Sequence, residues 1–278
     1  MTGPDFDHFC ALVRARSGFV ITADKGYLVR SRLDPIARSL GLAGASDLLA
    51  QLRRDHSEAL IERCVEAMAI HESFFFRDGA PFQQMTDTVL PALIAARKVS
   101  KSLRIWCAAC SSGQEPYSVA MVLQEFAMQL TGWRIEIVAT DLSEQILRKA
   151  RSGVYSDFEV RRGLSPERLR RFFRQDGLSW EISPQLKQMV SFRSHNLIQG
   201  TAGMGRFDLI LCRNVLIYFD VDQKRRILDD LARCLSEDGS LFLGSAETVI
   251  GITDAFELTP GSRGLYRRPG GLREARSA

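Results

Sequence analysis

The sequence predicts a small all-α N-terminal domain followed by an α/β domain of the Rossmann-like type, whose parallel sheet carries an antiparallel β-subdomain as an insertion. Three observations support this fold class. Apolar residues recur at helical spacing through residues 5–92, strands and helices alternate after residue 100, and residues 155–195 interrupt that alternation. We therefore expect a helical domain with its linker at 1–92, the α/β domain at 93–278 and the inserted β-subdomain at 155–195.

The helical domain is predicted from the spacing of its apolar residues. Phe6, Phe9 and Val13 would lie on one face of a first helix. A second helix begins near Thr22, and Asp34-Pro35 is expected to end or kink it, because proline lacks the amide hydrogen that a helix interior needs. Ala45-Ser46-Asp47 is typical of a further helix start.

Buried strands alternate with amphipathic helices in the second half of the chain. The predicted strands are Leu103–Ala109, Arg134–Thr140, Phe207–Arg213, Ser240–Gly244 and Gly264–Arg267. The predicted helices between them are Pro116–Leu130, Glu144–Ala150 and Asp222–Leu235. This alternation favours a doubly wound parallel sheet. In the insertion, Asp176-Gly177 is a hairpin turn signal. The Gly-, Arg- and Ser-rich residues after Pro269 are expected to form a mobile tail.

Composition narrows the class of protein. The chain has 278 residues, 45% of them hydrophobic, and a formal net charge of +4, which is too small to favour a nucleic-acid-binding protein. No apolar run approaches the roughly 20 residues that span a bilayer, and the N-terminus lacks the basic segment of a secretory signal. We expect a cytoplasmic protein that does not insert into membranes.

Cysteine spacing gives no metal site. Cys107 and Cys110 form a C-x-x-C pair, but no second pair or H-x3-H motif completes a zinc site. We interpret the two as small packed thiols in a turn and predict no bound metal.

A loop of small residues follows the first predicted strand and points to a ligand site. Ala108–Tyr117 reads A-A-C-S-S-G-Q-E-P-Y and leads into a helix. Open α/β sheets bind ligands at the carboxyl ends of their strands. Asp141, which ends the next strand, is placed to accept hydrogen bonds from ribose hydroxyls, although it or Ser143 can instead be a helix N-cap. The loop lacks the G-x-G-x-x-G fingerprint, which disfavours a nicotinamide dehydrogenase.

Three other segments are unusual. His195-Asn196-Leu197 and Cys212-Arg213-Asn214 come where strands of such a sheet end, and an asparagine amide can recognise the edge of adenine or simply cap a loop. Glu72–Asp78 places three adjacent aromatic residues between charges. That segment is either an interdomain hinge or a lid over a ligand, and both can hold.

The ordered set E-S-F-F-F-R, C-S-S-G-Q-E-P-Y-S-V-A, A-T-D-L-S and C-R-N-V-L-I-Y-F resembles the chemotaxis receptor methyltransferases of the CheR type through nearly the whole chain. The resemblance implies an S-adenosylmethionine (SAM)-dependent enzyme that forms methyl esters on glutamate side chains of methyl-accepting chemotaxis receptors, with S-adenosylhomocysteine as product. It implies the cytoplasmic domain of such a receptor as partner. We expect a monomer.

The resemblance also implies residue roles. Two residues are expected on the substrate side as catalytic residues: Arg77 and Tyr218. The expected cofactor contacts are His71, Ser73, Arg77, Glu115, Asp141, Asn196, Leu197, Cys212 and Arg213. His71 stands where the family has asparagine, Ser73 replaces threonine and Gln114 replaces glutamate. Because an imidazole titrates near neutrality, His71 predicts a cofactor affinity that varies near pH 6–7.

The expected reaction is attack of a carboxylate oxygen on a sulfonium methyl group. A glutamate side chain is already ionised at neutral pH, so no strong general base is needed. Two alternatives stay open: a methyltransferase acting on another acceptor, since fold does not fix substrate, and a SAM-binding receptor-interaction module without turnover. Arginines and Lys25 near the N-terminus give a locally positive segment, which is either a docking surface for an acidic receptor helix or a solvated helix face. Some members of the family bind a receptor's C-terminal peptide at the β-subdomain edge, but the hairpin here is short, and we expect no such tethering.

Overall fold

The computed structural model describes residues 2–55 and 57–270, so most of the Gly/Arg/Ser-rich tail lies outside the described residues. The chain forms two compact units. One contains Met1–Ile70 together with Tyr218–Gln223, and the other contains His71–Ile217 and Lys224–Ala278. Among the described residues, no helix is long and apolar enough to cross a membrane.

The first unit is helical, as expected. Its helices are α1 (Pro4–Ser17), the short η1 (Ala23–Lys25), α2 (Gly26–Ser39), α3 (Ala45–Arg54) and α4 (Glu58–Glu66). Their apolar faces form one core, which includes Phe9, Val13 and Leu33. Asp34-Pro35 is expected to end or kink the second helix, and an end there is wrong, because α2 continues to Ser39. The Asp34 carboxylate accepts a hydrogen bond from the Ala45 amide at the start of α3.

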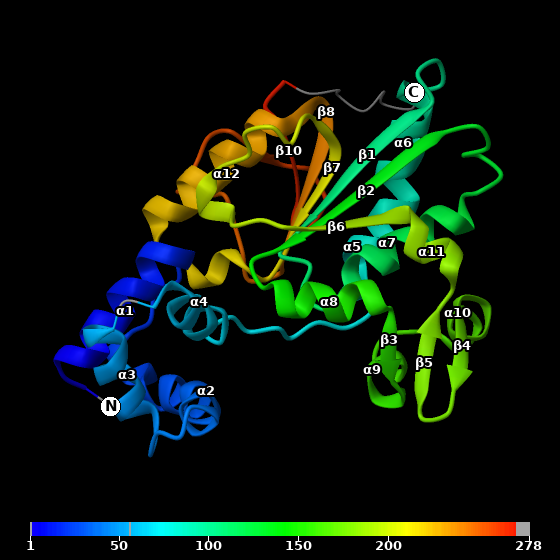
Figure 1. Cartoon of the computed structure of the whole chain (residues 1–278). Helices are drawn as coiled ribbons and strands as arrows, with labels where there is room; N and C mark the ends of the chain where they lie inside the picture. Colours follow the sequence, from blue (N-terminus) through cyan, green and yellow to red (C-terminus); the bar gives the residue numbers. More distant parts are fainter. Residues whose placement is uncertain (1, 56, 271–278) are drawn as a thin grey trace. The chain divides into compact units, whose positions relative to one another are not determined.

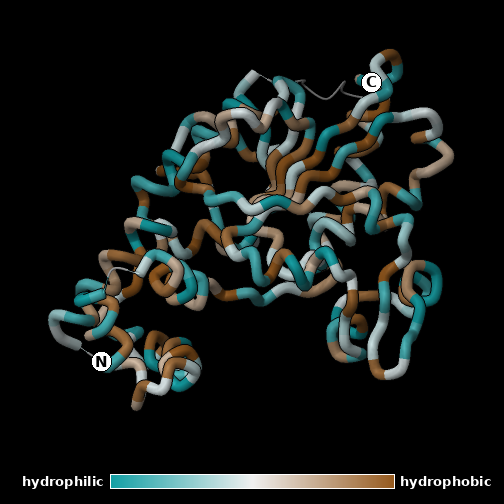
Figure 2. Tube along the Cα trace, viewed as in Figure 1, coloured by the Kyte–Doolittle hydropathy of each residue, from teal (hydrophilic) through white to brown (hydrophobic). Residues whose placement is uncertain are grey.

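The second unit is built on a seven-stranded sheet with the order β6-β2-β1-β7-β8-β10-β9 (Figure 1). Its strands are β1 (Ser102–Ala108), β2 (Arg134–Asp141), β6 (Val190–Ser194), β7 (Phe207–Cys212), β8 (Leu235–Leu243), β9 (Glu257–Leu258) and β10 (Leu265–Arg267). Strands β6, β2, β1, β7 and β8 are parallel to one another. β10 pairs antiparallel with β8 on one side and with β9 on the other. Figure 2 shows hydrophobic residues concentrated along these strands, and every residue of β7 is buried.

Helices cover both faces of this sheet. They are α5 (Ala80–Gln84), η2 (Met85–Val89), α6 (Leu90–Ala96), α7 (Gln114–Glu125), α8 (Glu144–Ser152) and α12 (Val221–Cys234). The connection through α7 runs from β1 toward β2, whereas α12 connects β7 to β8 in the opposite direction. Right-handed crossovers therefore place α7 and α12 on opposite faces, as Figure 1 shows.

The insertion is a three-stranded antiparallel sheet with the order β3-β5-β4. It contains β3 (Val154–Ser156), α9 (Asp157–Arg161), α10 (Pro166–Phe172), β4 (Phe173–Asp176), β5 (Ser179–Ile182) and α11 (Pro184–Met189). The hairpin at Asp176-Gly177 is confirmed. One part of the prediction is wrong: Val190–Ser194, which we assigned to the insertion, is β6 and pairs with β2 in the large sheet.

Residues 71–96 pack on the α/β core. Phe75, Phe82 and Leu90 are buried in the same cluster as strand residues such as Ile105. The chain segment that we grouped with the helical domain as its linker is thus part of the second unit beyond Ile70.

Candidate functional site

The carboxyl ends of the parallel strands lie side by side and form one edge of the sheet. Ala108, the last residue of β1, pairs in register with Thr140 of β2 and with Cys212 of β7. Asp141 pairs with Ser194 of β6. The predicted site residues that follow or end β1, β2, β6 and β7 therefore lie at this edge, which we call the cofactor edge.

The loop after β1 turns sharply at this edge. Ala109, Ser111 and Gly113 have φ values of 55°, 51° and 93°, in the left-handed region that L side chains rarely adopt. A Cβ atom on Gly113 would lie 3.0 Å from the Tyr155 hydroxyl oxygen and 3.0 Å from Ala150 Cβ, so close packing and the positive φ both favour glycine at this position. The backbone is held in an unfavourable conformation here, which is typical of a ligand-binding turn.

Asp141 is buried at the end of β2 and fixes this loop. Its Oδ2 accepts a hydrogen bond from the Ser111 amide at 2.8 Å, and its Oδ1 accepts one from the Ser143 amide at 3.1 Å. The Leu142 amide hydrogen-bonds this carboxylate as well. Because a carboxylate has about four acceptor positions, acceptor capacity for a ribose hydroxyl remains. Burial raises the pKa of Asp141, whereas the Ser143 amide and the nearby positive charge of His71 lower it. Ser143, not Asp141, is the side-chain N-cap of α8.

Ser111 also joins the His71–Asp78 segment to the loop. Its hydroxyl donates to the His71 carbonyl oxygen at 3.3 Å. The Phe76 amide donates to Ser118 Oγ at 3.0 Å, which ties the same segment to α7. Ser73 lies between these two attachments and is half-buried. The structure therefore brings His71 to the cofactor edge near Asp141, and Ser73 follows two residues later in the same segment.

Arg213 is the centre of a buried ion network. Its side chain is only 1% exposed. Nη1 donates to Glu115 Oε2 at 2.8 Å, and Nη2 donates to Asp78 Oδ2 and to the Arg77 carbonyl oxygen, each at 2.8 Å. Burial raises the pKa of Glu115, and the charge of Arg213 opposes that rise. Arg213 thus links three segments that are distant in sequence, and its guanidinium binds protein groups.

Arg77 has different contacts. Its Nη1 donates to the neutral carbonyl oxygen of Glu72 at 2.7 Å, and its guanidinium lies 5.5 Å from the centre of the Phe74 ring. The half-buried side chain is near enough to Glu115 for its charge to lower the pKa of that carboxyl group. Arg77 therefore brings a positive charge to the site.

The adenine-side pair follows β6. The His195 amide donates to the Asp141 carbonyl oxygen at 3.0 Å, which holds this segment beside the end of β2. Asn196 Oδ1 accepts from the Ile198 amide at 3.3 Å and begins η3 (Leu197–Gln199). Asn196 and Leu197 are both half-buried. Asn196 is a cap in this structure, so the capping interpretation is confirmed, and contact with adenine stays a prediction.

The cysteines are packed thiols. Cys107, Cys110 and Cys212 are buried, and burial raises the pKa of each thiol well above its ordinary value. Across residues 2–55 and 57–270, no group of three potential metal ligands comes together.

Tyr218 is the predicted residue that belongs to the other unit. It ends η4 (Leu216–Tyr218), its ring packs edge-on against Phe19 at 5.6 Å between centroids, and its carbonyl oxygen accepts from the Val20 amide. Its catalytic role stays a prediction.

Sequence reasoning missed Glu247. This carboxylate is buried after β8 and accepts four backbone hydrogen bonds: Oε1 from Val215 and Leu216, and Oε2 from Asn214 and Gly244. It holds the turn that follows Arg213. Its position three residues after Gly244, where the predicted strand ends, is the sequence feature that could have identified it. Its partners, however, are backbone amides, which no side-chain motif reveals.

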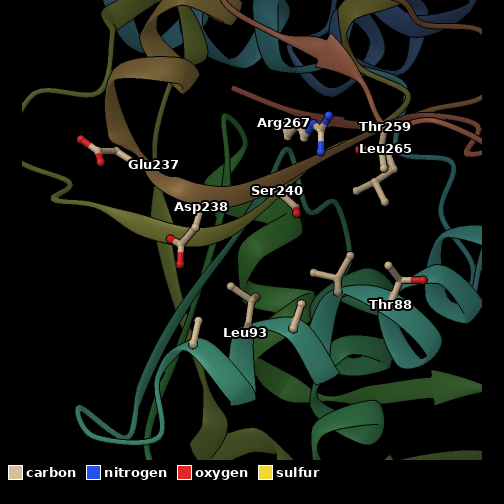
Figure 3. A pocket seen from close by; sticks show the side chains of 12 residues that line it. Thr88, Leu93, Glu237, Asp238, Ser240, Thr259, Leu265 and Arg267 are labelled. Carbon is tan, nitrogen blue, oxygen red and sulfur yellow. The ribbon is translucent and has the colours of Figure 1, made fainter. Parts of the chain in front are cut away.

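The amino ends of the strands carry a cavity of about 90 Å³ between α6, β8 and β10 (Figure 3). Leu93, Ser240 and Leu265 are among its lining residues. Ligand pockets usually measure at least ~300 Å³, so this cavity is too small for a nucleoside. The cofactor edge fits one better, because its turn lets a ligand approach the backbone and Asp141 retains acceptor capacity.

Comparison with known proteins agrees with this assignment. Residues 71–265 match the family model "CheR methyltransferase, SAM binding domain", and residues 4–69 match "CheR methyltransferase, all-alpha domain". The chain is 39% identical over 264 residues to chemotaxis protein methyltransferase 1 of Vibrio cholerae, covering 94% of this chain and 95% of that protein. It is 40% identical over 268 residues to chemotaxis protein methyltransferase 1 of Pseudomonas aeruginosa, covering 95% and 97%. It is 33% identical over 259 residues to the chemotaxis protein methyltransferase of Salmonella typhimurium, covering 91% and 86%.

These matches span both units and include the cofactor edge, so the resemblance stated from the motifs is confirmed and the predicted cofactor is SAM. The chain belongs to the CheR methyltransferase family.

Proposed function

We propose that this enzyme transfers the methyl group of SAM to glutamate side chains on the cytoplasmic domain of a methyl-accepting chemotaxis receptor. The product would be a glutamate methyl ester, which makes the enzyme a protein-glutamate O-methyltransferase. The names of its relatives support a role in chemotaxis. We further expect the protein to be cytoplasmic and monomeric. Size-exclusion chromatography of the purified chain tests whether it is a monomer.

The observation that carries the choice of glutamate is Arg77. Arg213 is already paired with two carboxylates, whereas the Arg77 guanidinium hydrogen-bonds a neutral carbonyl oxygen. Its charge is therefore available to a carboxylate that enters the site, and a guanidinium binds a carboxylate through two parallel hydrogen bonds. An acceptor without negative charge would gain less from this arginine.

The chain's own residues would bind and align the reactants. SAM supplies an electrophilic methyl group on a positively charged sulfur. Asp141 would hold a ribose hydroxyl, and Arg77 would hold the incoming carboxylate. Because a glutamate carboxylate is ionised at neutral pH, no residue of the site has to remove a proton from the substrate. Arg213 and Glu115 would keep the Arg77 backbone in place, and alignment of reacting groups is itself a large source of rate enhancement.

The test is to incubate the protein with methyl-labelled SAM and receptor cytoplasmic fragments, and to measure label released by base. Methyl esters on glutamates, located by mass spectrometry, are the expected result. Arg77→Ala should lower kcat/KM for receptor by about 100-fold, Arg77→Lys less, and Arg170→Ala, an exposed arginine of α10, should leave it unchanged.

Two outcomes count against the proposal. Base-stable label on the receptor would indicate another acceptor group. Intact SAM binding without transfer to any receptor fragment of the host would indicate a binding module without turnover.

A further inference from the structure

The three aromatic residues Phe74–Phe76 all contact the inserted β-subdomain, although they belong to the segment that reaches the cofactor edge. Phe74 lies against Arg162, which follows α9. The Arg162 guanidinium lies 4.3 Å from the centre of the Phe74 ring and forms an ion pair with Glu72 at 2.7 Å. One arginine of the insertion therefore contacts this segment on both sides of Ser73.

Phe75 is held by a close backbone approach. Gly163 has φ +99°, and a Cβ atom there would lie 1.8 Å from the Phe75 carbonyl oxygen. Atoms cannot approach so closely, and a backbone oxygen cannot swing aside as a flexible side chain can. The Phe75 ring also packs edge-on against Tyr155 of β3 and Phe173 of β4, at 5.0 and 5.5 Å between centroids. Any other residue at 163 must displace Phe75 or the insertion.

Phe76 is held by Arg168 of α10. The Arg168 guanidinium lies 3.9 Å from the centre of the Phe76 ring, and it is oriented by two hydrogen bonds to the Glu125 carboxylate, at 2.8 and 2.9 Å. Glu125 ends α7, the helix that leads away from the cofactor-edge loop. Phe76 itself has φ 50°, a conformation that surrounding contacts must maintain.

We propose that the insertion is a positioning element for SAM: Arg162, Gly163 and Arg168 hold the His71–Arg77 segment in the conformation that binds the cofactor. This rests on the proposed cofactor contacts of His71, Ser73 and Arg77. The insertion acts on this segment through its contacts with Phe74, Phe75 and Phe76. The segment is then competent for SAM only when the insertion is folded against it.

The central test is Gly163→Ala, with SAM affinity measured by calorimetry on the full chain without receptor. If displacement leaves the segment competent for about a tenth of the time, the Kd for SAM rises about tenfold. The matched control is Gly177→Ala on the same insertion. Gly177 also has positive φ, at +57°, but nothing lies within 4 Å of its added Cβ. The control also places a side chain at a positive φ, although at a value that L residues adopt more readily, and it causes no collision, so its SAM affinity should equal that of the wild type.

Two milder variants keep the test decisive if Gly163→Ala does not fold. Arg168→Ala removes a partly exposed guanidinium, and Arg162→Ala an exposed one. Each should raise the Kd for SAM about threefold. Arg168→Lys keeps the charge near the ring and should recover part of that loss, whereas Arg170→Ala on the same helix should cause none. Hydrogen exchange at the amides of residues 74–77 should accelerate in step with the loss of SAM affinity.

Wild-type SAM affinity in both Arg162→Ala and Arg168→Ala would overturn the inference. So would a folded Gly163→Ala that binds SAM as tightly as Gly177→Ala does. Because the readout is SAM binding alone, an absence of receptor methylation by the wild type would contradict the proposed function and leave this inference intact.

Discussion

Replacing Glu247 with glutamine tests whether one buried carboxylate holds the turn after β7. Glu247→Gln keeps the size of the side chain but exchanges one carboxylate oxygen for an NH2 group. Each oxygen accepts two backbone amides at 2.6–2.8 Å. Whichever oxygen is replaced, two amides lose their acceptor and face another donor.

The magnitude follows from those two hydrogen bonds. A hydrogen bond to a charged group contributes about 1.5–3 kcal/mol, so the loss of two lowers the free energy of unfolding by about 3–6 kcal/mol, unless the turn opens to water. An opened turn lowers that cost but releases Asn214, whose φ of 60° the carboxylate helps to maintain. Methyl transfer would then fall, because Arg213 precedes this turn.

Urea unfolding measures the stability and labelled SAM with receptor measures transfer. Glu237→Gln, the same change at an exposed position of β8, is the control and should be neutral. If Glu247→Gln loses less than about 1 kcal/mol and keeps full activity, the carboxylate does not organise the turn. Glu247→Asp should also fail, because the shorter side chain cannot reach all four amides.

Three further predictions concern the ionisable groups of the site. Arg213→Met should lower the free energy of unfolding by about 3–5 kcal/mol near neutral pH. The loss should shrink on acidification, because the raised pKa of Glu115 lets that carboxyl group become neutral. A loss that urea titrations find independent of pH would contradict this prediction. SAM affinity should fall on acidification, and the fall should begin above about pH 4, the ordinary carboxyl pKa, because the pKa of Asp141 is raised and its protonated form loses acceptor capacity. His71→Asn should move this fall in affinity to higher pH, since it removes a positive charge that lowers the pKa of Asp141. A SAM affinity that calorimetry finds independent of pH in both proteins would refute the assignment of Asp141 to the cofactor. Cys110 should resist thiol reagents in the native protein and react quickly in urea, because burial raises its pKa; rapid native labelling mapped by mass spectrometry would show an accessible thiol.

Local patterns predicted most of the fold. The prediction of two strands, Arg134–Thr140 and Phe207–Arg213, is confirmed almost to the residue. Every residue of Phe207–Cys212 is buried, and so are the last five residues of Arg134–Asp141. The assignment of Val190–Ser194 to the insertion is wrong because five residues that follow a short helix look the same in sequence whether they pair locally or with a distant strand. Asp34-Pro35 is predicted to end or kink the second helix, but α2 continues through Pro35 to Ser39, with Leu33 and Ile36 buried on either side.

The site was predicted less completely. Asp141 could be recognised because it ends a strand, and its geometry follows from the sheet. Arg213 could be placed at the cofactor edge, but its engagement by Glu115 and Asp78 depends on side-chain packing between segments that are distant in sequence. Ser111 contributes through its amide and hydroxyl, and no motif distinguishes those contacts from an ordinary turn.

The helical unit is discontinuous in sequence, and this affects how the protein can be cut and recombined. Residues 218–223 belong to it: Asp220 pairs with Arg14 at 2.6 Å, and Phe219 packs on Phe19. A truncation that begins at His71 would leave Phe219 without its aromatic partner and expose apolar surface. A chimaera that exchanges the first seventy residues between relatives should therefore exchange this hexapeptide too, so that both halves of the unit come from one parent.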